Sequence, residues 1–362
     1  MNLRLSLAGT AALVKGHPWI AAEDQLSYRQ PPDAGTLVKV QDSLGNFLGW
    51  AVSEGPGRAP AFRVLSRQRG VEIDAAWWAG AVERALARRA VGGGEVRGAW
   101  RLIAGEADEI PGIVADVCGG IALVSAEGEA LAGRLAEIEQ ALLAQARLNG
   151  VWRRFRDRHG NWEPWHRSPL TPFCAGVLED SSPGGGPSLD LAASPDAEEP
   201  LAPPPRRAWR EWAAESCRGA SVLVLGPLER EARAARDGGA VRVEEAPRRL
   251  SEALTQAQSW RPARVLAEVP AEARESFGRF EASRNTPRLL KALTECAAPG
   301  AEALLTSPHP ALASVGAWER CFAEAEIAAE FVRPLGPGAD CPELPVFREG
   351  KHRRAFLFRL PV

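Results

Sequence analysis

A stretch rich in proline, glycine and serine, residues 179–207, divides this chain of 362 residues into two parts with different patterns. It contains Ser181-Ser-Pro-Gly-Gly-Gly and Pro203-Pro-Pro. A segment of such composition buries too little apolar surface to order itself. We therefore expect a loop or linker here, with at least one domain on either side. A chain of this length is typical of two or three domains.

The part before the linker begins with a pattern of short β-strands. Apolar and polar residues alternate over 35–42, turn-forming residues follow at 42–46, and apolar residues resume over 47–53. A third strand is expected over 61–66, after a turn rich in glycine and proline. The first 70 residues are therefore predicted to form a small β-domain. Lysine and arginine outnumber aspartate and glutamate in it by eight to five.

Helix and strand patterns mix over residues 71–178. Apolar residues recur at helical spacing over 73–90 and again over 131–142, and a strand–turn–strand pattern lies between them at 112–124. These patterns predict a middle α+β domain. Beyond the linker, over 208–362, short apolar strands alternate with alanine-rich helical stretches, which predicts an α/β domain.

Composition excludes several classes of protein. Six cysteines are widely dispersed and form no Cys-x-x-Cys pair, which argues against a disulfide-rich secreted protein and a local zinc site. No stretch is long and apolar enough for a transmembrane helix, and the N-terminus lacks a secretory signal pattern. We therefore expect a cytoplasmic protein with no membrane partner and no bound metal. The net charge of −2 indicates no partner, so basic surface has to be sought locally.

Three segments, in order, resemble one family, the PUA-domain S-adenosylmethionine (SAM)-dependent 23S rRNA cytosine-C5 methyltransferases. The segments are Gly16-His-Pro-Trp-Ile with 38–49 and 62–66, then Arg101–Asp116, and finally Asp340-Cys-Pro with 345–350. The resemblance is strong over 1–125 and weak but collinear beyond. It implies a multidomain α/β chain whose partner is structured RNA, ribosomal in this family.

The resemblance also gives each part of the chain a fold. It implies a PUA-like, RNA-binding β-barrel over 1–70 and a middle α+β domain over 71–178. The proline- and glycine-rich linker occupies 179–207. A Rossmann-like class I methyltransferase domain is implied over 208–362.

Basic residues in two places are candidates for RNA contact. In the PUA-like domain the candidates for contact with an RNA backbone are Lys15, His17 and Arg63. In the middle domain they are Arg153, Arg154 and Arg156, in the most basic and aromatic stretch of the chain. Arginines on phosphates, with interleaved tryptophans at 152, 162 and 165 for base stacking, would suit single-stranded RNA. The alternative is a solvated strand edge whose tryptophans are buried.

The family's cofactor loop contains two glycines, where the backbone approaches SAM closely. Here the corresponding strand leads into Gly226-Pro-Leu-Glu-Arg-Glu, so Arg230 and Glu231 stand at the glycine positions. In the family an acid at the end of the next strand holds the ribose, a role that Glu244 or Glu245 could take. The alternative is an acid that is simply solvated. Gly226 and Glu244 are the candidate cofactor residues, and SAM is the cofactor if any is bound.

The family's catalytic motifs are largely replaced. Ala267-Glu-Val-Pro stands where the family has Asp-Pro-Pro, and Leu304-Leu-Thr-Ser-Pro-His-Pro stands where the nucleophilic cysteine is expected. Cytosine-C5 methylation needs a cysteine thiolate that adds to C6 of the base. Cys296 lies upstream in a helix pattern, where we expect it to pack. His309 is either a general base or a packing residue, and no catalytic residue is assigned.

The C-terminal domain is also short. About twenty residues separate Glu244 from Arg264, too few for the usual helix, strand and second helix. We expect a truncated methyltransferase fold that lacks a strand, and a homodimer would cover the exposed edge. Three functions stay open: an RNA-binding pseudo-methyltransferase with a decayed site, an active SAM-dependent RNA methyltransferase without a cysteine nucleophile, and a protein-interaction module. The sequence of 226–232 favours the first.

Overall fold

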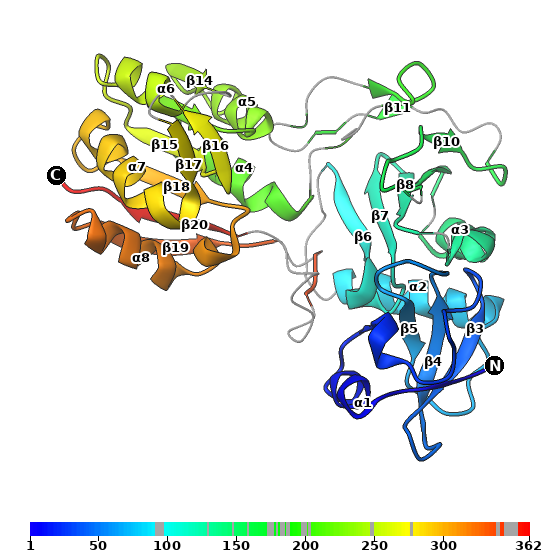
Figure 1. Ribbon diagram of the computed structural model, residues 1–362. Coiled ribbons are helices and arrows are strands. Elements are labelled where there is room, and N and C mark those ends of the chain that lie inside the picture. The colour runs from blue at the N-terminus through cyan, green and yellow to red at the C-terminus, as the bar shows by residue number, and fades with distance from the viewer. Residues whose placement is uncertain are drawn as a thin grey trace. The chain divides into compact units, whose positions relative to one another are not determined.

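The computed structural model describes residues 1–90, 98–128, 130–146, 148–157, 159–171, 177–178, 180–181, 185, 189–196, 201, 204–246, 250–275, 278–337, 341–343 and 354–362. These residues form two compact units (Figure 1). The N-terminal unit comprises residues 1–180 with parts of 187–204 and 339–351. The C-terminal unit comprises most of 205–338 and 354–362 with part of 181–186. The finer domain boundaries expected from the sequence stay a prediction.

A five-stranded sheet forms the first part of the N-terminal unit, in the order β1-β3-β4-β5-β2. Its strands are β1 (Asn2–Arg4), β2 (Trp19–Ile20), β3 (Leu37–Gln41), β4 (Phe47–Ser53) and β5 (Phe62–Ser66). The predicted hairpin β3–β4 and the predicted third strand β5 are present, and β5 pairs antiparallel with β4. Helix α1 (Leu7–Val14) begins at Ser6, whose hydroxyl accepts a hydrogen bond from the Gly9 N–H. A short 3-10 helix, η1 (Ala22–Asp24), follows β2.

A second five-stranded sheet follows in the same unit, in the order β10-β9-β8-β7-β6. Its strands are β6 (Trp100–Ala104), β7 (Ile113–Cys118), β8 (Ile121–Ala126), β9 (Gly150–Phe155) and β10 (His166–Arg167). Helices α2 (Ala75–Ala90) and α3 (Leu135–Gln145) contribute Trp78 and Ile138 to the apolar core under this sheet. The 3-10 helices η2 (Gly105–Asp108) and η3 (Ala132–Arg134) complete an α+β arrangement.

Part of the expected linker packs against this second sheet. Strands β11 (Val177–Leu178) and β12 (Leu189–Asp190) pair with each other, and Leu191 and Leu201 are buried in a cluster with Trp152 and Trp165. These leucines give the described part of the segment apolar contacts that its composition does not indicate, because large tryptophan side chains lie against them. The extent of the linker stays a prediction.

The C-terminal unit is a six-stranded sheet with helices on both faces, in the strand order β14-β13-β15-β18-β20-β19 (Figure 1). The strands are β13 (Ser221–Leu225), β14 (Arg242–Ala246), β15 (Arg264–Glu268), β18 (Glu302–Thr306), β19 (Glu330–Leu335) and β20 (Ala355–Arg359). The first four strands of the order are parallel, and β20 is antiparallel to both of its neighbours. A hairpin, β16 (Glu272–Glu275) and β17 (Gly278–Glu281), follows β15.

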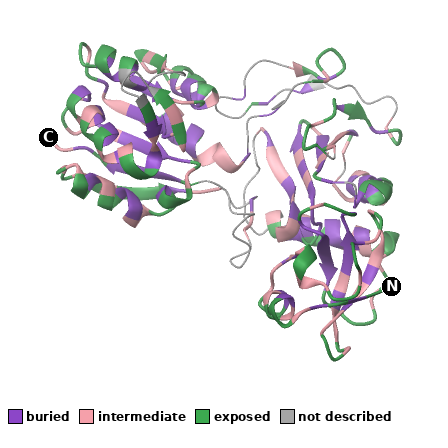
Figure 2. Cartoon of the chain, in the orientation of Figure 1, coloured by how far each residue is buried: buried purple, intermediate pink, exposed green. Residues whose placement is uncertain are grey.

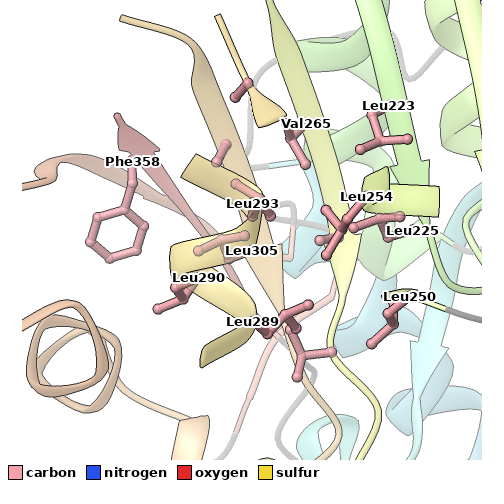
Figure 3. Packing of buried hydrophobic residues seen from close by; sticks show 14 of the residues in the cluster. Leu223, Leu225, Leu250, Leu254, Val265, Leu289, Leu290, Leu293, Leu305 and Phe358 are labelled. Carbon is pink, nitrogen blue, oxygen red and sulfur yellow. The ribbon is translucent and has the colours of Figure 1, made fainter. Parts of the chain in front are cut away.

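Alternating strand residues give this sheet two apolar faces. One face packs on α6 (Leu250–Ala257), α7 (Ala282–Cys296) and α8 (Val315–Glu324), which η5 (Pro310–Leu312) precedes. Figure 3 shows Leu254, Leu290 and Phe358 in this layer. The other face packs on α4 (Arg207–Ser216), which η4 (Pro204–Arg206) precedes, and on α5 (Glu229–Asp237) through residues such as Trp209 and Ala232. The central strands are accordingly buried (Figure 2).

The predicted truncation of this sheet is present. Between β14 and β15 the described residues form helix α6, and β14 is the edge strand of the sheet. Its exposed residues include Arg242 and Glu244, and charged side chains on an edge strand discourage edge-to-edge pairing. A homodimer that covers this edge stays a prediction.

Candidate functional site

The ends of β13 and β15 mark the place in the C-terminal unit where a cofactor would be expected. From β13 the chain crosses to β14 on one side, while β15 lies on the other side of β13. Open α/β sheets bind their ligands at the carboxyl ends of the strands, where the strand order reverses in this way. The residues that follow Leu225 and Ala267 therefore decide whether a cofactor fits.

The backbone N–H groups in the turn after β13 form hydrogen bonds within the protein. The Gly226 N–H donates to the Ala246 carbonyl at 3.4 Å, Pro227 has no N–H, and the Leu228 N–H donates to the Gly226 carbonyl at 2.9 Å. Gly226 has a φ of +90°, and a Cβ there would lie 2.9 Å from the carbonyl oxygen of Glu268. The close approach of two strand ends therefore explains this glycine without a ligand.

Arg206 crosses the same strand ends. Its guanidinium lies 3.4 Å from the Pro227 carbonyl oxygen and 3.4 Å from the Glu268 carboxylate. Glu268, the last residue of β15, is 7% exposed, so Arg206 links the turn after β13 to the buried end of β15. The sequence identifies the position of Glu268 but gives no signal for this contact, because Arg206 comes from η4, far away in the chain.

The two residues at the family's glycine positions are also engaged. Arg230 donates a hydrogen bond of 2.6 Å to the Gly185 carbonyl, and Glu231 is buried at 2% exposure beside the fully buried Arg210. A side chain at either position fills space that a glycine would leave to the cofactor. Together with the closed turn at Gly226, this arrangement does not fit SAM.

Glu244 does not stand at the end of its strand. In the β13–β14 register Glu244 lies opposite Leu223 and Ala246 lies opposite Leu225. The Glu244 carboxylate is about half exposed and pairs with Arg242 at 3.1 Å, and Glu245 pairs with Arg236. The register thus separates Glu244 from Gly226 along the strand direction, so the two do not surround one ribose.

The catalytic positions also hold residues with local structural roles. The Ser307 hydroxyl donates to the Val269 carbonyl at 2.7 Å and accepts from the His309 N–H. The His309 Nδ1 accepts from the Ala311 N–H at 3.2 Å and caps η5. These contacts agree with a packing role for His309.

The described cysteines of this unit are held as thiols. Burial raises the pKa of Cys217 to about 12 and that of Cys296 to about 11, and it also raises the pKa of Cys321. Cys296 packs at the end of α7, as its sequence pattern predicts. A thiol with a raised pKa supplies little of the thiolate that cytosine-C5 chemistry needs.

In the N-terminal unit the three predicted RNA contacts differ in exposure. Lys15 is exposed just after α1, and His17 is half-buried, with its carbonyl accepting from Arg67. Arg63, in contrast, is 4% exposed and pairs with the carboxylates of Glu54 and Glu106. Contact between Arg63 and RNA stays a prediction, and its burial between two acids argues against it.

The segment Arg101–Asp116, one of the three that resemble the family, has partners in the interior of the N-terminal unit. Asp108 is fully buried and accepts from Arg89 at 2.6 Å and from the Ala104 N–H at 2.7 Å. Asp116 accepts two hydrogen bonds from Arg101, at 2.8 and 3.0 Å. Glu106 likewise pairs with Arg63. These three ion pairs indicate that the segment stabilises the interior of the N-terminal unit.

The arginines on and directly after β9 are held by three kinds of contact. Arg153 pairs with the fully buried Glu139 at 3.3 Å. The Arg154 guanidinium carbon lies 4.4 Å from the ring centroids of both Trp162 and Trp165. Arg156 lies 5.5 Å from the Trp162 centroid and donates to the Gly160 carbonyl at 2.8 Å. The structure therefore brings these arginines and tryptophans together, and a cavity of about 350 Å³ lies beside them.

In the described part of the chain, no three histidine, cysteine, aspartate or glutamate side chains come together to hold a metal ion. No helix in that part is long and apolar enough to cross a membrane. The family-like motif at 345–350 and the preceding Asp340 lie outside the described residues.

The fold defines a chain with an N-terminal PUA-like domain and the fold of SAM-dependent methyltransferases. Residues 3–67 match the family model of the PUA-like domain. Two solved structures align with 99% of this chain and 100% of their own at 14% identity, with TM-scores of 0.77 and 0.75. One is described as a "putative methyltransferase" complexed with SAH, and the other as a "putative SAM-dependent methyltransferase" from Streptococcus mutans.

One relative is similar in sequence over a shorter stretch. A ribosomal RNA large subunit methyltransferase from Deinococcus radiodurans is 31% identical over 126 residues, which cover 33% of this chain and 31% of that protein. The match thus spans about a third of the relative. Specificity for cytosine C5 does not follow from it.

Proposed function

We propose that the chain binds structured RNA through its N-terminal unit and that its methyltransferase-fold unit transfers no methyl group. The observation that carries the second part is the closed turn at Gly226. Its N–H groups bond within the protein, and Arg206 and Glu268 cover the strand ends at the switch point. A cofactor would have to break these contacts before it could bind at the strand ends.

The RNA-binding part rests on the N-terminal unit. It contains the PUA-like domain, an exposed Lys15 after α1 and an exposed Arg156 at the end of β9. The similar protein from Deinococcus radiodurans is a ribosomal RNA large subunit methyltransferase, so ribosomal RNA is the partner to test first. An active SAM-dependent RNA methyltransferase without a cysteine nucleophile is the alternative.

Calorimetric titration of the full chain with SAM and with S-adenosylhomocysteine (SAH) separates these two functions. We expect no heat of binding up to millimolar ligand, because the turn from Gly226 to Leu228 leaves no N–H for a ligand. Micromolar binding of either compound would overturn the non-catalytic proposal. Transfer of a labelled methyl group to ribosomal RNA would then identify the active alternative.

RNA binding is tested separately, by fluorescence anisotropy with a labelled stem-loop of ribosomal sequence at several salt concentrations. The variant Lys15→Gln should weaken binding and reduce the salt slope by about one, as expected for the loss of a phosphate contact. Lys291→Gln, an exposed lysine of α7 in the other unit, is the matched control and should change neither. A wild-type chain that does not bind RNA would refute this part and favour a protein-interaction module.

A further inference from the structure

Four side chains near β9 form an alternating stack of rings and guanidinium groups. In order they are Trp165, Arg154, Trp162 and Arg156, with distances from guanidinium carbon to ring centroid of 4.4, 4.4 and 5.5 Å. Each distance is within the ~6 Å over which a cation is attracted to an aromatic ring. We refer to these four residues as the ladder.

The local backbone builds the ladder. Arg154 lies on β9 and Arg156 directly follows the strand two residues later, so their side chains emerge on the same side. The chain then turns back, and an isolated bridge places Trp162 opposite Arg156. The Asp157 carboxylate holds the turn by accepting from the N–H groups of His159 and Asn161 at 2.8 Å each.

The ladder runs from the interior to the surface. Trp165 is 3% exposed, Arg154 and Trp162 are half-buried, and Arg156 is exposed. The Arg154 guanidinium carbon lies 4.4 Å from the ring centroids of two tryptophans. Arg156 is the outermost member, and its Nε–H donates to the Gly160 carbonyl at 2.8 Å.

The surroundings of the ladder favour a base over a phosphate. The cavity beside its middle is lined by Arg154, Trp162 and two exposed acids, Glu163 and Asp196, while Arg156 lies outside this lining. Carboxylates repel a phosphate group, whereas they accept hydrogen bonds from the amino groups of a nucleobase. Arginine planes and aromatic rings are the surfaces on which unpaired RNA bases stack.

We propose that an unpaired RNA base stacks on Arg156 and extends the ladder by one member. The proposal rests on the RNA binding proposed above and adds how one residue takes part in it. Of the three arginines expected to contact RNA here, Arg153 is engaged by Glu139 and Arg154 by two rings. Arg156 is the exposed one of the three, and in this proposal it acts through its planar face and not as a point charge on the backbone.

The variant Arg156→Lys tests this directly, because lysine keeps the charge and loses the planar face. Anisotropy would be measured on the full chain with a labelled stem-loop that carries a single-stranded tail of adenosines. We expect Arg156→Lys to weaken binding about tenfold, nearly as much as Arg156→Ala, with the salt slope unchanged. Arg134→Lys, an exposed arginine of η3 in the same unit, is the matched control and should bind like the wild type.

A second probe removes the bases and keeps the phosphates. With an abasic tail, the wild-type chain should lose the same factor, and Arg156→Lys should lose nothing further. If Arg156→Lys binds the adenosine tail as the wild type does while Arg156→Ala does not, Arg156 is a phosphate contact and the stacking proposal is wrong. If the wild type binds neither probe, the proposed RNA binding fails and this proposal fails with it.

Discussion

The residues at family-like positions have different structural roles in the two units of the chain. In the N-terminal unit, Glu106, Asp108 and Asp116 each receive an arginine partner, and these pairs lie in or near the interior. In the C-terminal unit, the six-stranded sheet has an apolar cluster packed against each of its two faces. The turn at Gly226, however, is closed by its own backbone and covered by Arg206.

This contrast shows that a fold and its ligand site depend on different residues. The sheet needs apolar residues along strands such as β13 and β15, and many residue types meet that requirement. A cofactor cradle needs a few turn residues with small side chains and available N–H groups. Substitutions at those few positions can therefore change the cradle while the packing of the sheet stays intact.

The largest effect is expected from the charge cluster of the N-terminal unit. Arg63→Ala leaves Glu54 and Glu106 buried without their cation, and removing one partner of a buried pair costs about 3–5 kcal/mol. Denaturant unfolding of the full chain should show this loss of unfolding free energy in the transition of the N-terminal unit. Arg84→Ala, which breaks an exposed pair with Glu109, should cost less than about 1 kcal/mol. Equal losses for the two variants would mean that the cluster does not hold the unit together.

The C-terminal core is expected to be nearly as sensitive. Leu290 is fully buried in α7 against the sheet (Figure 3), and Leu290→Ala should cost about 2–5 kcal/mol. The exposed Leu44→Ala serves as the control and should cost almost nothing. RNA affinity should stay unchanged in Leu290→Ala under conditions where the unit is folded. A loss below about 1 kcal/mol would indicate that the unit is loosely packed, and the contrast of intact fold and lost site would not hold.

A smaller effect is expected at the turn itself. Gly226→Ala forces a residue with a Cβ into a left-handed conformation, at about 1–2 kcal/mol, and places that Cβ 2.9 Å from the Glu268 carbonyl oxygen. Gly239 has the same φ of +90°, but its Cβ would meet only Arg218 Cγ at 3.7 Å. Thermal unfolding should therefore show a larger loss for Gly226→Ala than for Gly239→Ala. Equal losses would mean that the two strand ends tolerate the added atom, leaving room that a ligand could use.

Much of the fold follows from sequence periodicity. Strands such as β3, β4, β15 and β18 have several alternating or buried apolar residues, and their positions are predictable. Strands of two or three residues, such as β1 and β2, are too short to show a period. The sequence pattern does not reveal β19, because Glu330–Leu335 includes charged residues and a proline, which an edge strand tolerates.

Sequence patterns locate a site residue only where that residue stands at the end of a predictable strand. Gly226 and Glu268 stand at the ends of strands that the sequence indicates, so their places can be identified. The pairing of Arg63 with Glu106 and of Arg206 with Glu268 joins residues 43 and 62 positions apart. A basic residue in a sequence gives no sign of whether an acid from a distant segment neutralises it.

The smallest effect is expected in the reactivity of the cysteines of the C-terminal unit. A raised pKa leaves less thiolate at any pH below it. With pKa values of about 12 and about 11, Cys217 and Cys296 should be thiolate on the order of one part in ten thousand and one in a thousand at pH 8. Iodoacetamide labelling of the folded chain, followed by mass spectrometry, should therefore modify the half-buried Cys321 first and spare both buried thiols until the chain is unfolded.

Rapid labelling of Cys296 at neutral pH would contradict this expectation. It would reveal an available thiolate at the end of α7, the helix that precedes the strand before the predicted nucleophile position. The C-terminal unit would then have kept a reactive group as well as its fold. Because the proposed loss of methyl transfer implies a preserved sheet without preserved chemistry, that result would contradict the proposal.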